Sequence, residues 1–194
     1  MGPPPHPRNV CGHKLVVGGM AVQRLNHAVL YVRDIERTTE FYGDVLGFRI
    51  VMSLPGAAFL QAPDSTNDHD LGVFQMGADA AASEAGRSTV GLYHLAWEVD
   101  SLGELQRLAE VLRERGALLG ASDHGTTKSL YARDPDGLEF EVVWIIPAHL
   151  LSADDIAARS SVRALDLRAE LERFGRDELG GVGISHHRSN ARTT

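Results

Sequence analysis

The 194-residue chain has little of what marks several large classes of protein. Its single cysteine, Cys11, has no partner for an internal disulfide, which fits the reducing cytoplasm. No apolar run approaches the length of a membrane span, and residues 1–19 do not read as a secretory signal. The net charge of −7 argues against a nucleic-acid partner, because such proteins usually present a basic face. We therefore expect a cytoplasmic protein with no membrane or nucleic-acid partner.

Composition and patterning divide the chain into four parts. Hydrophobic residues make up 43% of it, which is ordinary for a globular protein. We expect a disordered leader at residues 1–20, one domain at 21–150, a helical extension at 151–178 and a flexible tail at 179–194. Apolar residues of the extension lie loosely at helical spacing, which favours one or two helices packed on the domain or on a second subunit. A homo-oligomer is therefore expected.

An internal repeat runs through the central domain. His27 lies 67 residues before His94, and the same offset matches Leu25 with Leu92. Self-similarity at one offset dictates architecture, and two copies favour two modules related by a pseudo-two-fold axis. The modules are expected at residues 24–76 and 90–146, joined by an Ala-, Gly- and Ser-rich segment.

Each copy predicts the same order of elements: a strand, a helix and three further strands. Asp34 is expected to cap the first helix and Gly47 to end it. The helices are predicted at 35–46 and 102–115, and the strands at 25–32, 48–54, 57–62, 69–76, 92–99, 117–121, 127–133 and 138–146. Two such modules indicate an α+β fold, in which the two sheets form a partly closed barrel around a metal cleft.

Two histidines and one carboxylate face that expected cleft. Side chains alternate along a strand, so His94 and Glu141 point away from bulky apolar neighbours such as Trp97. A carboxylate in a closed cleft needs a partner, and a divalent metal supplies one. His27, His94 and Glu141 form the ligand set of a facial triad for non-haem Fe(II), with open positions for substrate and oxygen. The rival carboxylate, Glu139, is expected to lie at the rim or in a salt bridge.

These features resemble a known superfamily. The motifs that carry the resemblance are Phe41-Tyr42, then Val45-Leu46-Gly47-Phe48, and the turn Asp134-Pro135-Asp136-Gly137 ahead of Glu141. Together with the paired modules, they resemble the vicinal oxygen chelate superfamily of glyoxalases, bleomycin resistance proteins and dioxygenases. Within it, residues 124–141, HGTTKSLYARDPDGLEFE, look like the pattern of type I extradiol ring-cleaving dioxygenases. The resemblance covers about residues 24–146, and the short chain resembles the single-domain form.

The resemblance implies an extradiol dioxygenase that opens the ring of a catechol-type aromatic diol with O2 at Fe(II). Mn(II) is the other ion that such a site accepts. The three ligands named above would hold the metal. The resemblance also implies that His69 is an acid–base histidine and that His124 and Tyr131 hydrogen-bond the substrate or an intermediate. Ser122 and Leu138 depart from the pattern, and the separation of His69 from His94 is longer than in two-domain enzymes.

Other functions share this fold. A glyoxalase I or an epimerase generally takes a further ligand from the last strand of the first module. There the 67-residue offset from Glu141 gives Phe74, with Gln75 beside it, and neither is a carboxylate. A thiol transferase of the fosfomycin-resistance type would share the triad but not the arrangement of His124 and Tyr131. A metal-free binding protein would have no use for the triad. Taken singly, His69 also reads as a surface residue, His124 as a loop residue and Tyr131 as core packing.

Overall fold

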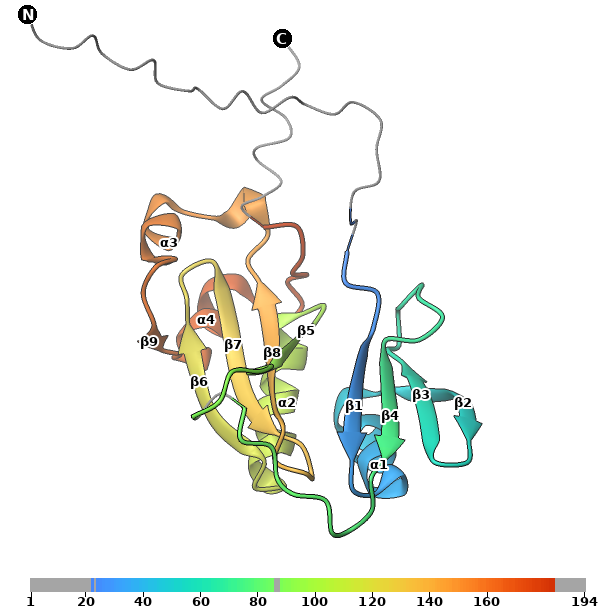
Figure 1. The fold of residues 1–194 in the computed structure, drawn as a ribbon. Coiled ribbons are helices and arrows are strands. Elements are labelled where there is room, and N and C mark those ends of the chain that lie inside the picture. Colours follow the sequence, from blue (N-terminus) through green and yellow to red (C-terminus); the bar gives the residue numbers. More distant parts are fainter. Residues whose placement is uncertain (1–21, 23, 86–87, 184–194) are drawn as a thin grey trace, which may run out of the picture.

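The computed structural model describes residues 22, 24–85 and 88–183. Cys11, the whole of the expected leader and residues 184–194 of the expected tail lie outside these residues. Within them the chain forms two modules in succession, each a strand, a helix and three further strands (Figure 1). The predicted α+β class and the repeated order of elements are therefore confirmed.

The two modules have the same sheet topology. The first comprises β1 (Ala28–Val32), α1 (Ile35–Leu46), β2 (Arg49–Leu54), β3 (Ala57–Gln61) and β4 (Leu71–Gln75). The second comprises β5 (Leu95–Glu98), α2 (Leu102–Glu114), β6 (Leu118–Asp123), β7 (Thr127–Arg133) and β8 (Glu139–Ile145). The sheets run β1-β4-β3-β2 and β5-β8-β7-β6-β9, where β9 (Arg163–Ala164) comes from the segment after the second module. In each sheet the first strand pairs in parallel with the last strand of its module.

Helix α1 has the predicted bounds, and α2 begins as predicted and ends one residue earlier, at Glu114. The Asp34 side chain accepts a hydrogen bond from the Arg37 amide, and Ser101 caps α2 in the same way. Gly47 follows α1 with a φ of 74°, a left-handed conformation that glycine adopts without strain. The side chains of Asp34 and Ser101 thus satisfy amides of the first helical turn that have no partner inside the helix.

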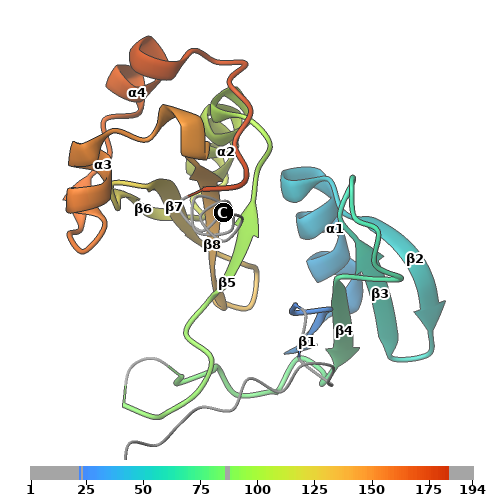
Figure 2. The same cartoon turned by 90° about the horizontal axis from the view of Figure 1, so that it is seen from above.

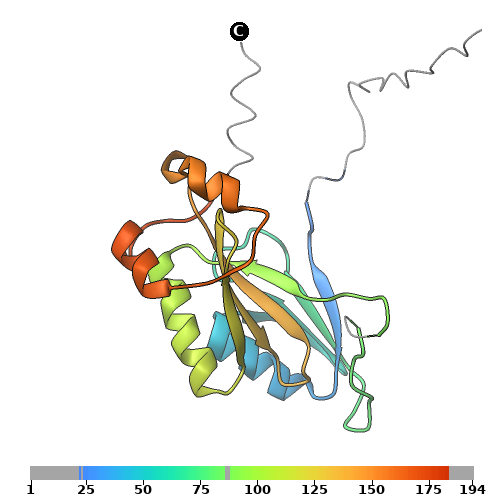
Figure 3. The ribbon, with the colours of Figure 1, turned by 90° about the vertical axis from the view of Figure 1, so that its left-hand side faces the viewer.

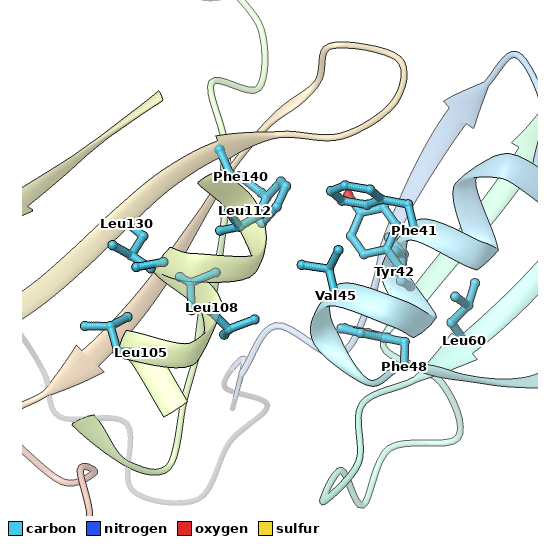
Figure 4. Close-up of a cluster of buried hydrophobic side chains, with 14 of the residues drawn as sticks. Phe41, Tyr42, Val45, Phe48, Leu60, Leu105, Leu108, Leu112, Leu130 and Phe140 are labelled. Carbon is cyan, nitrogen blue, oxygen red and sulfur yellow. The ribbon is translucent and has the colours of Figure 1, made fainter. Parts of the chain in front are cut away.

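The modules are joined by their helices and by aromatic side chains. Seen from above, α1 and α2 lie next to each other (Figure 2), and they are in contact. Figure 3 shows the two helices on one side of the molecule and the segment between β4 and β5 on the opposite side. Where the two modules meet, Phe140 of the second module faces Phe41 and Tyr42 of the first (Figure 4). Its ring centroid is 6.0 Å from that of Phe41 and 6.1 Å from that of Tyr42. Phe48 also meets Trp97 at 5.1 Å.

The two sheets are not closed into a barrel, which corrects that part of the expectation. Strands β1 and β5 are the outer strands of their sheets, and each is hydrogen-bonded on one side, to β4 and β8. Polar contacts that cross between the modules lie beyond the strand edges. The Arg33 guanidinium meets Asp136 at 3.0 Å, and the Arg107 guanidinium donates to the Val45 carbonyl at 3.2 Å. The helix layer therefore sets the angle between the sheets.

The segment after β8 packs on the second module. It contains the 3-10 helix η1 (Ala148–Leu150), α3 (Ala153–Ala158), β9 (Arg163–Ala164) and α4 (Leu167–Phe174). Strand β9 adds to the edge of the second sheet beside β6, and Phe174 lies 5.3 Å from Trp144 by ring centroids. In the part of the chain that the structure describes, no helix is long and apolar enough to cross a membrane.

Phe140→Ala tests the packing between the modules. Phe140 is 1% exposed, and truncating it would leave a cavity against Phe41 and Tyr42. We expect the free energy of unfolding, measured by urea denaturation, to fall by roughly 3–5 kcal/mol. The control Leu119→Ala, at a site that is 47% exposed, should change it by less than about 1 kcal/mol. Equal losses in the two variants would contradict the packing role of Phe140.

Candidate metal and catalytic site

The pairing of β5 with β8 brings two of the three expected metal ligands together. His94 lies one residue before β5, and Glu141 lies in β8 opposite Ala96. His94 Nε2 is 3.0 Å from Glu141 Oε2, and their side chains are 25% and 12% exposed. Nδ1 of His94 is buried and has no hydrogen-bond partner among the described residues.

Tyr131 and His124 lie next to this pair. Tyr131 is directly opposite Glu141 in the antiparallel pairing of β7 with β8, and its ring centroid is 5.9 Å from that of His94. The Tyr131 hydroxyl and His124 Nε2 are 2.9 Å apart and hydrogen-bonded. Burial, the Glu141 carboxylate and Tyr93 raise the pKa of Tyr131 above its ordinary value. The phenol therefore stays protonated at neutral pH and can donate a hydrogen bond.

The other two expected site residues form a second group, in the first module. His27 lies one residue before β1, and its ring centroid is 4.5 Å from that of His69, which precedes β4. His27 Nδ1 bonds to Asn26 Oδ1 at 2.8 Å, and His69 Nδ1 bonds to Asp68 Oδ2 at 2.9 Å. Each contact uses one ring nitrogen and leaves Nε2 available for a proton, a substrate or a metal ion.

The two groups lie on either side of the boundary between the modules. His27 lines a cavity of about 110 Å³ together with Leu95, Ala96 and Trp97 of the second module. Ala96 is the residue that pairs with Glu141, so the cavity reaches from His27 to the strand next to Glu141. Within residues 24–85 and 88–183, no three His, Cys, Asp or Glu side chains are placed to hold one metal ion. The expected convergence of all three ligands is therefore not seen, although His94 and Glu141 do come together.

The donor atoms of the second module suit a divalent metal. A separation of 3.0 Å is about that of two neighbouring ligands whose bonds to one ion are each about 2.1 Å. One imidazole and one carboxylate are also a donor combination that first-row metals accept. In the first module, Asn26 at Nδ1 orients the ring of His27 and leaves its Nε2 available, an arrangement that outer-shell partners also give to ligating histidines.

The strand register corrects one expectation from the repeat. Ala28 pairs with Leu71 in the first module, and Leu95 pairs with Phe140 in the second. By this register the counterpart of Glu141 is Gly72, 69 residues earlier, and not Phe74. Gly72 has no side chain to offer a ligand, and a Cβ there would lie 3.4 Å from Val29.

The remaining acidic residue at the strand end behaves as expected. Glu139 is paired with Arg133 at 2.8 Å, so it is a salt-bridging residue of the β7–β8 hairpin.

Sequence reasoning did not single out Tyr93, whose ring centroid is 4.7 Å from that of His94. Its position next to His94 in the sequence was the available signal.

Comparison with known proteins matches most of the two modules to one family. Residues 24–142 match the family model described as "Glyoxalase/Bleomycin resistance protein/Dioxygenase superfamily". Similar proteins include "Biphenyl-2,3-diol 1,2-dioxygenase 3" of Rhodococcus globerulus, at 36% identity over 59% of this chain and 59% of that protein. They also include "Catechol-2,3-dioxygenase" of Bacillus subtilis, at 31% identity over 61% of this chain and 40% of that protein.

Two further similarities widen the range of functions in the family. "Lactoylglutathione lyase" of Oryza sativa is 28% identical over 62% of this chain and 43% of that protein. The crystal structure of a glyoxylase/bleomycin resistance protein/dioxygenase domain from Frankia sp. EAN1pec superposes with a TM-score of 0.50 at 22% identity, over 63% of this chain and 92% of that one. The matched region is less than two thirds of the length of each of the three sequence relatives.

The turn that leads into β8 holds a buried carboxyl group. Asp134 Oδ1 accepts hydrogen bonds from the amides of Asp136 and Leu138, each at 2.9 Å. Oδ2 is buried and has no hydrogen-bond partner among the residues described. Burial raises the pKa of Asp134 to about 6, against the lowering effect of the backbone hydrogen bonds.

Asp134→Asn tests this pKa through stability. Because the folded pKa is raised, the folded chain holds a proton between about pH 4 and pH 6 that the unfolded chain has released. The free energy of unfolding should therefore fall as the pH rises through this window, by on the order of 2 kcal/mol from this group. Asp134→Asn should remove that fall, measured by urea denaturation at pH 4 and pH 7, while the exposed control Asp64→Asn keeps it. An unchanged pH dependence in Asp134→Asn would contradict the raised pKa.

Proposed function

This chain belongs to the glyoxalase/bleomycin resistance protein/dioxygenase superfamily, and from that premise we propose that it is an extradiol dioxygenase. The reaction is the opening of a catechol-type ring with O2 at a non-haem Fe(II). The observation that carries the proposal is the His94–Glu141 pair lying beside the hydrogen-bonded Tyr131 and His124. The two relatives whose names are those of diol dioxygenases support the same reaction class.

In this proposal His27, His94 and Glu141 hold the metal. When bound, a ferrous ion at such a ligand set supplies open positions for a diol and for O2 and conducts electrons between them. The structure does not bring His27 together with the other two ligands, so the proposal requires His27 to reach them from its side of the small cavity. The outer strands β1 and β5 carry no strand partner on that side in the described sheets, so no ladder has to break.

The polar side chains around the ligands have separate tasks. His69, beside His27, takes a proton from a substrate hydroxyl and returns one later, a task suited to a histidine. Tyr131 donates a hydrogen bond toward the substrate oxygen and stabilises negative charge that develops there. His124 holds the Tyr131 hydroxyl in place through their 2.9 Å contact.

A larger cavity, which Tyr93 lines but the proposed metal ligands do not, offers room for the body of an aromatic substrate. It has a volume of about 560 Å³ and lies between the modules, within the usual range for small-molecule sites of roughly 300–1,000 Å³. Val29 and Tyr31, on the strand that follows His27, line it from the first module, and Leu92 and Tyr93 line it from the second. These four side chains are each at least 49% exposed, so a flat apolar group could cover them.

The runner-up function is an isomerase of the lactoylglutathione lyase type, because proteins of that name are also similar. That reaction generally uses a further metal ligand from the last strand of the first module. The position equivalent to Glu141 there is Gly72, which offers none. The dioxygenase is therefore favoured over the isomerase.

An oxygen-consumption assay tests the reaction. Full-length protein loaded anaerobically with Fe(II) should consume O2 in an amount equal to the diol supplied and form a yellow ring-opened product. The panel should include simple and aryl-substituted catechols, because the apolar cavity is expected to favour the latter. No O2 uptake with any catechol at full iron occupancy would contradict the proposal. Turnover of a glutathione hemithioacetal without O2 would establish the runner-up.

Histidine substitutions separate metal binding from proton transfer. His94→Ala and His27→Ala should each lose iron and activity together, because each removes a ligand. His69→Ala should retain iron and slow kcat by roughly 10²–10⁴-fold, the usual contribution of a general acid–base group. His149→Ala, in η1, is the control and should change neither quantity. Normal kcat in His69→Ala, or full iron content in His94→Ala, would show that the roles are assigned wrongly.

A further inference from the structure

The loop that carries His124 is held by the C-terminal segment. His124 follows β6 at the turn to β7, and its amide donates to the Thr127 carbonyl at 3.0 Å. The C-terminal strand β9 pairs with this end of β6, where Asp123 lies opposite Arg163. The segment after β8 is therefore in direct contact with the part of the chain that positions His124.

A buried lysine lies behind the loop. Lys128 is 1% exposed and is on β7, on the opposite face from Tyr131. Its ammonium is 2.7 Å from Asp123 Oδ1 and 3.3 Å from Glu170 Oε1 of α4. A buried ammonium is costly unless it is paired, so these carboxylates are needed to keep Lys128 inside.

Asp123 is the centre of this network. Its carboxylate accepts hydrogen bonds from the Gly125 amide, the Lys128 ammonium and the Arg163 guanidinium, each at 2.7 Å. Burial raises the pKa of Asp123, but the hydrogen bonds from Lys128 and Gly125, together with the charges of Lys128 and Arg163, leave the pKa below its ordinary value. Two donors that follow His124 in the chain, Gly125 and Lys128, and one from β9 therefore converge on the residue that precedes His124.

Helix α3 closes the other side of the loop. Gly125 has a φ of 76°, and a Cβ at this position would lie 2.4 Å from the carbonyl oxygen of Asp155. This approach is possible because glycine has no side chain. Asp155 is itself paired with Arg173 of α4, with the closer contact at 2.6 Å. The loop is thus fixed by charge on one side and by packing on the other.

We propose that the C-terminal segment is a part of the active site that positions His124 against Tyr131, through Arg163, Asp123 and Lys128. This inference rests on the proposed function, because the 2.9 Å His124–Tyr131 contact is the one it protects. Asp123, Lys128 and Arg163 are positioning residues and do not touch the substrate. Displacing a side chain of the site by about 1 Å can cost up to about 100-fold in rate, which makes such positioning consequential.

Arg163→Gln is the most informative variant. Arg163 is 53% exposed, so the protein should fold, yet the variant removes one of the three hydrogen bonds to Asp123. Its matched control is Arg168→Gln on α4. The Arg168 side chain is 90% exposed, and the variant removes the same charge from an ion pair at the surface. Arg163→Lys is the conservative variant, which restores the charge.

We expect kcat of Arg163→Gln to fall about 10-fold, with iron content and the KM for the diol changed by less than about 2-fold. Arg168→Gln should match the native enzyme, and Arg163→Lys should recover most of kcat. The ring nitrogen signals of His124, identified by their loss in His124→Gln, should shift in Arg163→Gln and not in Arg168→Gln when measured by ¹⁵N NMR on the full chain.

Lys128→Met provides a second variant, with the same expected shift of the His124 signals. The positioning role is overturned if these signals and kcat are native in Arg163→Gln, or if Arg168→Gln changes them equally. The NMR comparison needs no turnover. A shift of the His124 signals without any diol cleavage would therefore uphold the positioning and reject the dioxygenase.

Discussion

The parallel pairing of β5 with β8 is the constraint on which the candidate site depends. It sets Ala96 opposite Glu141 and brings His94 Nε2 within 3.0 Å of the carboxylate. The chain between β5 and β8, which contains α2, β6 and β7, provides the long crossover connection that parallel neighbours need. The Ser101 cap and the buried face of α2 then hold the crossover against the sheet. Burial of Phe140 and Trp144, on the other face of β8, keeps Glu141 turned away from the helix layer.

The two modules share a topology but not a chemistry. At equivalent positions of the sheets, the second module carries Glu141 and Tyr131, and the first carries Gly72 and Phe59. The first module contributes its histidines from the segments just outside its strands. The carboxylate and the phenol of the candidate site therefore come from the second sheet alone, because the equivalent positions of the first sheet carry no polar side chain.

Much of this arrangement was predictable from local sequence signals. Caps and glycines predicted both long helices, and strand alternation predicted which face Glu141 occupies. The register of β4 was not predictable from the repeat, because the connections differ. The first module enters β4 through a loop organised by Asp70, whose carboxylate bonds to the Ala62 amide and to Ser65, whereas the second uses the tight turn at Asp134. The angle between the sheets depends on packing between the modules, which leaves no periodic pattern in the sequence. The same holds for the Asp123–Lys128 network, which joins residues from distant segments of the chain.

The central claim is that His27, His94 and Glu141 bind one ferrous ion together. Anomalous X-ray diffraction at the iron absorption edge, on crystals of the full-length protein loaded anaerobically with Fe(II), tests it directly. One iron peak per chain within bonding distance of His27, His94 Nε2 and a Glu141 oxygen is the predicted result. A peak bound elsewhere, or bound without His27, would contradict it.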